Sequence, residues 1–112
     1  MTYKLFTLHI YLIKMPNLKT SIKDLRQNKK RKTSNDRLRN RIKRAVKKQN
    51  TLVDEDKVEE ATKNIKRVYK VLDKAARKNV IKEGKADRIK SRLTKKLNEL
   101  SQNNVKTAKK SA

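Results

Sequence analysis

Apolar residues recur with the spacing of an amphipathic helix over three stretches of the chain. In the most regular stretch they alternate between three and four positions apart, at Val58, Ala61, Ile65, Val68, Leu72 and Ala75. A second stripe lies closer to the C-terminus, at Ala86, Ile89, Leu93, Leu97 and Leu100. A third lies earlier in the chain, at Leu38, Ile42, Ala45 and Val46. Each stripe predicts a helix that buries one face.

The earliest of these helices is predicted to be long. A hydroxyl group at Thr20 or Ser21 can cap its free backbone N–H groups, and we expect it to run to about Gln49. Residues 50–54 are then expected to form a connection to the next helix. Residues 1–14 are apolar and differ in composition from the rest of the chain, so we interpret them as an extension of unclear role or as the product of a start codon upstream of Met15.

The two later helices are separated by a predicted sharp reversal. Asp56 and Glu59 have the spacing of a capping box that begins the second helix. Asn79 suits the left-handed position that ends it. The third helix is expected over residues 85–100, and the polar residues 101–112 are expected to form a disordered basic tail.

An all-α fold is predicted, because one glycine and one proline in the chain leave few sites for the tight turns of a β-sheet. Three amphipathic helices with short connections bury their stripes most simply as an antiparallel bundle over residues 15–100. The first part of the first helix should project beyond this bundle. The alternative is an intermolecular coiled coil, but each stripe lasts only two or three heptads.

The charge of the chain indicates the class of its partner. Its 112 residues include 34 Lys and Arg against 11 Asp and Glu, a formal net charge of +23 that repels itself in any compact isolated state. A polyanion would offset that repulsion. A membrane surface would require bulky apolar residues opposite the charges, and the stretch between Arg26 and Arg37 has none, so we predict nucleic acid and no membrane partner.

Basic residues surround most of the first helix instead of lining one side of it. Folded RNA can enclose such a rod, whereas a single groove of duplex DNA presents phosphates mainly to one side, so RNA is favoured. The predicted contacts on the first helix are Lys19, Lys23, Arg26, Lys29, Lys30, Arg31, Lys32, Arg37, Arg39, Arg41, Lys43, Arg44 and Lys47. Those near the third helix are Lys82, Lys85, Arg88, Lys90 and Arg92.

Residues that could carry catalysis are scarce. His9 is the only histidine and has no partner nearby in the sequence, there is no cysteine, and Gly84 is the only glycine. The acidic residues between Asp54 and Glu60 suit the start of a helix better than a cation site. We predict that the chain is not an enzyme and has no catalytic, metal or cofactor site. Tyr69 is expected in the core, so RNA should be recognised by backbone and shape.

Three segments carry a resemblance to a known family. They are "MPNLKTSIK" from Met15, "KKRKTSNDRLR" from Lys29, and "LDKAARKNVIKEGKADRIKSRLTKKLNEL" from Leu72. Together they resemble the bacterial-type small-subunit ribosomal protein S20 family. The matching residues are Lys30, Arg31, Lys32, Asn35, Arg39, Asp73, Ala76, Lys78, Ile81, Lys85, Ala86, Arg88, Lys90, Leu93 and Leu97. Asn79 stands where the family usually has glycine, and residues 1–14 lie outside the family pattern.

This resemblance implies a three-helix bundle that binds 16S ribosomal RNA directly, low on the body of the small subunit, and helps it fold during assembly. It adds Asn35 to the expected RNA contacts and neighbouring small-subunit components to the expected partners. The free protein should be a monomer, located with the ribosome in the bacterial cytoplasm or in a plastid stroma. The rival hypothesis is a dimeric helical DNA-binding or scaffold protein that uses the second helix as a zipper.

Overall fold

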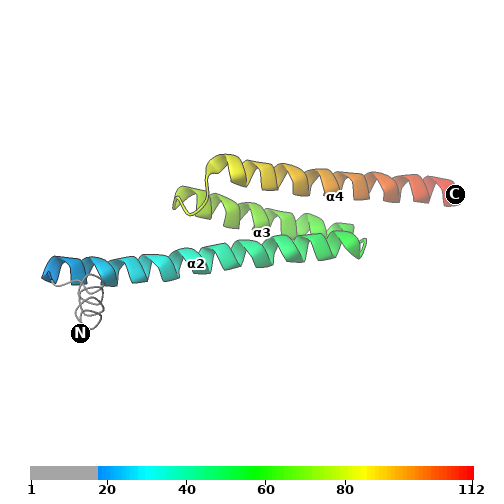
Figure 1. Cartoon of the computed structure of the whole chain (residues 1–112). Coiled ribbons are helices and arrows are strands. Elements are labelled where there is room, and N and C mark those ends of the chain that lie inside the picture. The colour runs from blue at the N-terminus through cyan, green and yellow to red at the C-terminus, as the bar shows by residue number, and fades with distance from the viewer. Residues whose placement is uncertain (1–17) are drawn as a thin grey trace, which may run out of the picture. The chain divides into compact units, whose positions relative to one another are not determined.

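The computed structural model describes residues 18–112, which form three α-helices and contain no strand. Helix α2 spans Lys19–Asp54, α3 spans Val58–Arg77 and α4 spans Glu83–Ser111 (Figure 1). The predicted all-α class is therefore confirmed. The extension predicted over residues 1–14 lies outside the described residues.

The chain divides into two compact units, residues 1–34 and residues 35–112, and α2 contributes to both. In the first unit, the described residues are Leu18 and the beginning of α2, residues 19–34. All of them are exposed except Ser21, which is partly buried. The apolar side chains of Leu18, Ile22 and Leu25 are among those exposed to solvent. This segment is held as a helix by its own backbone hydrogen bonds.

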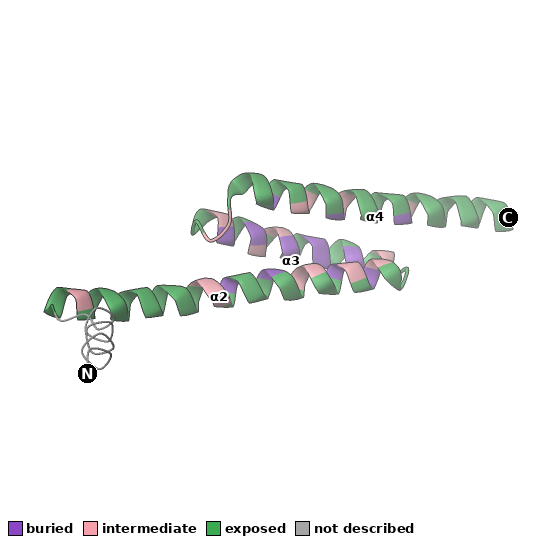
Figure 2. Ribbon diagram, viewed as in Figure 1, coloured by how far each residue is buried: buried purple, intermediate pink, exposed green. Residues whose placement is uncertain are grey.

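The hydrophobic core lies in the second unit, where consecutive helices run in opposite directions (Figure 1). Helix α3 supplies the most deeply buried side chains, and α2 and α4 pack their apolar stripes against it (Figure 2). The buried cluster consists of Ile42, Leu52, Ala61, Ile65, Val68, Leu72, Ala75, Ala86, Leu93 and Leu97. All three predicted stripes thus contribute to one core. Because the α3 stripe is covered by the chain's own helices, it is not available as an intermolecular zipper.

Helix α2 ends at Asp54, later than the predicted Gln49, because its buried face continues for another turn. Gln49 and Leu52 are buried, so the inward face continues for another turn through the residues expected to form a connection. Asp56 then adopts a left-handed conformation with φ of 57°. The Lys57 N–H donates to Leu52 O at 3.1 Å and the Asp56 N–H donates to Val53 O at 3.1 Å, the two bonds of a Schellman motif.

The capping box predicted for α3 is consequently wrong. Asp56 belongs to the turn that ends α2, and Lys57 takes the N-cap position of α3 without a side-chain capping bond. The opposite end of α3 matches its prediction, because Asn79 is left-handed with φ of 56°. There the Val80 N–H donates to Ala75 O at 3.0 Å in a second Schellman motif.

Helix α4 is longer at both ends than the predicted 85–100. Residues 101–111 were expected to be a disordered tail, whereas in the structure they continue the helix. Leu100 is the last buried residue and Ser101 is partly buried, so residues 102–111 are an exposed helical extension with local hydrogen bonds. One of these is the bond from Thr107 Oγ1 to Asn103 O, 3.0 Å long. No helix within residues 18–112 is long and apolar enough to span a membrane.

Candidate nucleic-acid interface

The basic residues of the first unit are all accessible. From Lys19 to Lys32, each side chain predicted to contact RNA is exposed. Asp24 is the only acidic residue between Leu18 and Ser34, and no ion pair joins any of these residues within the described part of the chain. Their charges therefore remain available to an external anion.

The basic residues on the remainder of α2 are also exposed, and Asn35 is partly buried. One of them has an acidic neighbour: Arg39 Nη1 lies 3.7 Å from Asp36 Oδ1, one turn earlier on the helix. Both side chains of this pair are about half exposed. An exposed pair of this kind contributes at most about 1 kcal/mol, so it does not prevent Arg39 from meeting a phosphate.

Five of the predicted RNA contacts lie around one groove between α2 and α4. The groove has a volume of about 980 Å³. Its basic lining consists of Arg39, Lys43, Lys47, Lys82 and Lys85. The three α2 residues are spaced by four and so share one side of the helix, while the other two lie where α4 begins. We call these five residues the basic rim.

The same groove also contains apolar side chains. These are Ile42, Val46, Val80, Ile81 and Ile89, which we call the apolar floor. All except Ile42 are only partly buried, so the floor is both attached to the core and open to solvent. The α3–α4 turn supplies Val80 and Ile81. The left-handed Asn79 makes the reversal of the chain there sharp.

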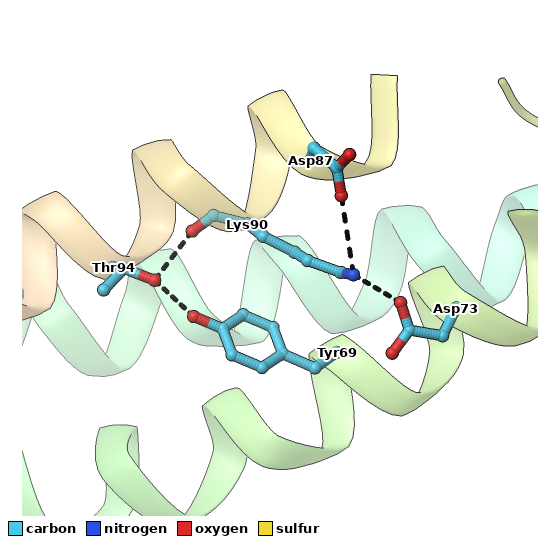
Figure 3. A network of polar contacts seen from close by, with 5 residues as sticks. All are labelled: Tyr69, Asp73, Asp87, Lys90 and Thr94. Carbon is cyan, nitrogen blue, oxygen red and sulfur yellow. Dashed lines mark hydrogen bonds and ion pairs between the residues drawn. The ribbon is translucent and has the colours of Figure 1, made fainter. Parts of the chain in front are cut away.

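Lys90 has a different environment from the other predicted contacts (Figure 3). Its Nζ forms an ion pair with Asp73 of α3 and lies 3.7 Å from Asp87 Oδ1 on α4. It also lies 6.0 Å from the centroid of the Tyr69 ring. The hydrogen bond to Asp73 raises the pKa of the Lys90 ammonium above its ordinary 10.5. Since its charge is already compensated inside the protein, Lys90 is less available to phosphate than its neighbours.

Tyr69 is part of the same contact between α3 and α4. Its hydroxyl is hydrogen-bonded to Thr94 Oγ1, which donates to Lys90 O at 2.8 Å. Because the Thr94 hydrogen is used in that second bond, Tyr69 is the donor in the first. The ring packs against the hydrophobic core, as the sequence predicted. Tyr69 therefore serves packing between the helices and presents no free platform for a base.

Residues 16–98 of this chain match the family described as ribosomal protein S20. The chain belongs to the ribosomal protein S20 family. Small ribosomal subunit protein bS20 of Halothermothrix orenii is 38% identical over 86 residues, which cover 77% of this chain and 99% of that protein. The protein of that name from Shouchella clausii is 42% identical over 87 residues, covering 78% and 99%. That of Kosmotoga olearia is 40% identical over 84 residues, covering 74% and 86%.

Members of the S20 family are structural proteins of the ribosome and not enzymes. The family assignment thus confirms both the resemblance and the prediction that the chain is not an enzyme. The matched region includes the whole groove, since the basic rim and the apolar floor all fall between residues 39 and 89. Residues 1–14 lie outside the match.

A buried polar pair between α2 and α3 was missed in the sequence of this S20-family chain. Gln49 is completely buried, its Nε2 donates to Ala61 O at 3.1 Å, and its Oε1 accepts a bond from Asn64 Nδ2 at 2.8 Å. The sequence does indicate that Gln49 is buried, because it follows Ile42 by seven residues and therefore falls on the apolar stripe. It was missed because the helix was expected to end there.

The acidic residues between Asp54 and Glu60 lie at the turn between α2 and α3 and in the first turn of α3. Lys57 Nζ pairs with Glu55 Oε2 at 2.9 Å, and this hydrogen bond raises the pKa of Lys57 above its ordinary value. Within residues 18–112, no three acidic or histidine side chains are placed to hold a metal ion. At this turn, the S20-family fold collects negative charge beside the positive end of the α3 dipole.

Proposed function

We propose that this S20-family chain is a structural constituent of the small ribosomal subunit that binds 16S rRNA directly and assists its folding and assembly. Family membership and the name of the relatives, small ribosomal subunit protein bS20, support the subunit assignment. The ribosome is then where the chain acts, beside neighbouring small-subunit components. The residues proposed to contact RNA are the basic residues predicted from the sequence, together with Asn35.

The observation that carries this proposal is the uncompensated charge of α2. Between Lys19 and Lys48 the only acidic residues are Asp24 and Asp36. The Arg39–Asp36 contact is the only ion pair that the described residues form in this stretch. Like charges four residues apart on one helix repel each other, and phosphates beside the helix would replace that repulsion with attraction.

Recognition by shape fits the surfaces that are exposed. Basic side chains on several sides of α2 can meet phosphates from more than one RNA strand, and the aromatic platforms typical of single-strand binding are lacking in residues 18–112. Charge compensation of this kind assists folding, because RNA helices brought close together repel one another through their phosphates. A basic rod between them lowers that repulsion and stabilises the assembled arrangement.

Salt dependence of binding to full-length 16S rRNA tests this mechanism. With six to ten phosphate contacts, affinity should fall by about 10³- to 10⁵-fold between about 50 and 200 mM salt. Replacing Arg31 and Lys32 with glutamine should lower the salt slope by about one for each contact removed. The matched control replaces Lys106 and Lys109, which are outside the predicted contacts, and should leave the slope unchanged. A wild-type slope near zero would refute the proposal.

The state of the free protein separates this function from its rival. We propose a monomer, since the apolar stripes that would form a zipper are already covered within the chain. Sedimentation without nucleic acid should give the mass of one chain. A stable dimer that binds duplex DNA as tightly as 16S rRNA would favour the DNA-binding or scaffold hypothesis instead.

A further inference from the structure

The groove between α2 and α4 combines two chemical surfaces that one ligand must match. Its floor is aliphatic and includes Val46, Ile81 and Ile89, and its rim is basic. The volume of about 980 Å³ is at the upper end of the range of about 300–1,000 Å³ that is usual for sites of drug-sized ligands. A nucleotide is a ligand of that size class. Its base is apolar on its faces, and its phosphate is anionic.

An RNA double helix matches only half of this site. Its backbone could lie along the rim, but it would place charged phosphates and sugars over the apolar floor and leave that floor without an apolar partner. An unstacked base in a loop or bulge can instead leave the RNA and enter a concave site, with its neighbouring phosphates outside. The rim suits the phosphates on either side of such a base, since Arg39, Lys43, Lys47, Lys82 and Lys85 outnumber Asp54, the one acidic residue in the lining.

Asn50 adds a group suited to the edge of a base. It lines the groove, and its Oδ1 is buried without a hydrogen-bond partner in the described part of the chain. A buried carbonyl oxygen without a partner is unfavourable, so a ligand that donates a hydrogen bond would be stabilised there. The side-chain amide has both an acceptor and donors, which suits the mixed donors and acceptors of a base edge.

From these observations we propose that the groove receives one unpaired base of the bound RNA, with the floor against its face and the rim against its flanking phosphates. This inference rests on the proposed function and adds a contact that is not a phosphate contact. It predicts that part of the RNA affinity is insensitive to salt and depends on uncharged side chains.

The first experiment compares two equivalent substitutions in the full chain. Val46→Gln places a polar side chain in the floor, and Val105→Gln makes the same change at an exposed position of α4 outside the groove. At fixed salt, Val46→Gln should weaken binding to 16S rRNA by about fivefold or more, with an unchanged salt slope, because the lost contact is an apolar one to a base face. Val105→Gln should bind like wild type, and far-UV circular dichroism checks that both variants are folded.

Chemical probing of the same complexes identifies the base. Dimethyl sulfate modifies unpaired adenines and cytosines in 16S rRNA, and a base held in the groove should be protected by wild type but reactive again with Val46→Gln. The backbone footprint on the RNA should otherwise persist. Equal affinity of Val46→Gln and wild type, with identical protection, would overturn the proposal. Equal affinity is also the result expected if a protein partner, and not a base, occupies the groove.

A crosslinking experiment decides the matter even if Val46→Gln fails to fold. The chain has no cysteine, so Thr51→Cys, an exposed groove position, gives a unique site for a thiol-linked photo-crosslinker. The expected product is a crosslink to one unpaired nucleotide, which Thr107→Cys, outside the groove, should not form. Crosslinks confined to paired nucleotides would overturn the base proposal while leaving the proposed function intact. If wild type itself fails to bind 16S rRNA, the proposed function fails instead.

Discussion

Replacing Gln49 with alanine should destabilise the bundle by about 2–4 kcal/mol. The side chain is 0% exposed and makes two hydrogen bonds, to Ala61 O at 3.1 Å and from Asn64 Nδ2 at 2.8 Å. Each bond contributes about 0.5–1.5 kcal/mol, and the truncation leaves the Asn64 donor without its partner. The lost side-chain packing adds on the order of 1 kcal/mol, since at least one buried methylene is removed. The sum is large for a small helical bundle.

A double-mutant cycle separates the hydrogen bonds from the packing. Gln49→Leu keeps the volume but leaves Asn64 unpaired, and Asn64→Leu leaves Gln49 with only its bond to Ala61, so both single variants should be destabilised. Replacing both residues with leucine removes both polar groups, and such replacement can be nearly neutral. The expected coupling between the two positions is about 1–3 kcal/mol, favouring the matched pairs.

Urea unfolding followed by far-UV circular dichroism measures these differences in the full chain. Buffer with moderate salt screens the repulsion among exposed lysines, so that changes in the midpoint report on the core. If Gln49→Ala lowers the free energy of unfolding by less than about 0.5 kcal/mol, its effect is no larger than that of a typical surface substitution. That result, or strictly additive effects in the leucine cycle, would refute the inference that a buried hydrogen-bonded pair joins α2 to α3.

Two further predictions concern α3 and its contact with α4. Leu72→Ala should lower the free energy of unfolding by about 2–5 kcal/mol in urea, because Leu72 is 0% exposed and its truncation leaves a cavity in the hydrophobic core. A loss below about 1 kcal/mol would contradict close packing there. The hydrogen bond with Asp73 raises the pKa of Lys90 above 10.5, so its stabilisation is fully present below the ordinary lysine pKa and is lost as pH rises through the higher folded-state value. The difference in unfolding midpoint between wild type and Lys90→Met should therefore shrink from about pH 9 to about pH 12, and a constant difference would count against the ion pair.

The helices could be predicted because hydrophobic periodicity reports directly on which face is buried. Four of the six α3 stripe positions, Ala61, Val68, Leu72 and Ala75, are 0% exposed. The turns were harder to predict, because the C-terminal turn of one helix and the N-terminal cap of the next can use the same residues. Aspartate is favoured at an N-cap, but the hydrogen-bonded end of α2 places Asp56 in a left-handed turn. The Asn79 turn was predicted correctly because no rival cap surrounds it.

The candidate site was only partly predictable, since composition identifies charges but not their neighbours. The basic residues are almost all exposed, as their number suggested. That Lys43 and Lys85 line one groove depends on how α2 and α4 pack against α3, which no local pattern specifies. The same packing brings Asp73 to Lys90, so one lysine among many similar ones is neutralised. Hydrophobic periodicity does not predict which side chains of different helices come into contact.

Polar contacts between the helices bear on the groove because they join α2 and α4, which form its two walls, to α3. Of these contacts, the Gln49–Asn64 pair is buried and the Lys90–Asp73 ion pair lies nearer the surface. Gln49 and Asn64 set the register of α2 on α3, while Asp73 and Lys90 set that of α4 on α3. Apolar stripes alone tolerate small shifts along a helix, whereas a hydrogen-bonded pair is satisfied in one position only. The double variant Gln49→Leu/Asn64→Leu should therefore retain most of its stability but bind 16S rRNA less tightly. Wild-type affinity in that variant would show that the groove keeps its shape without the polar register.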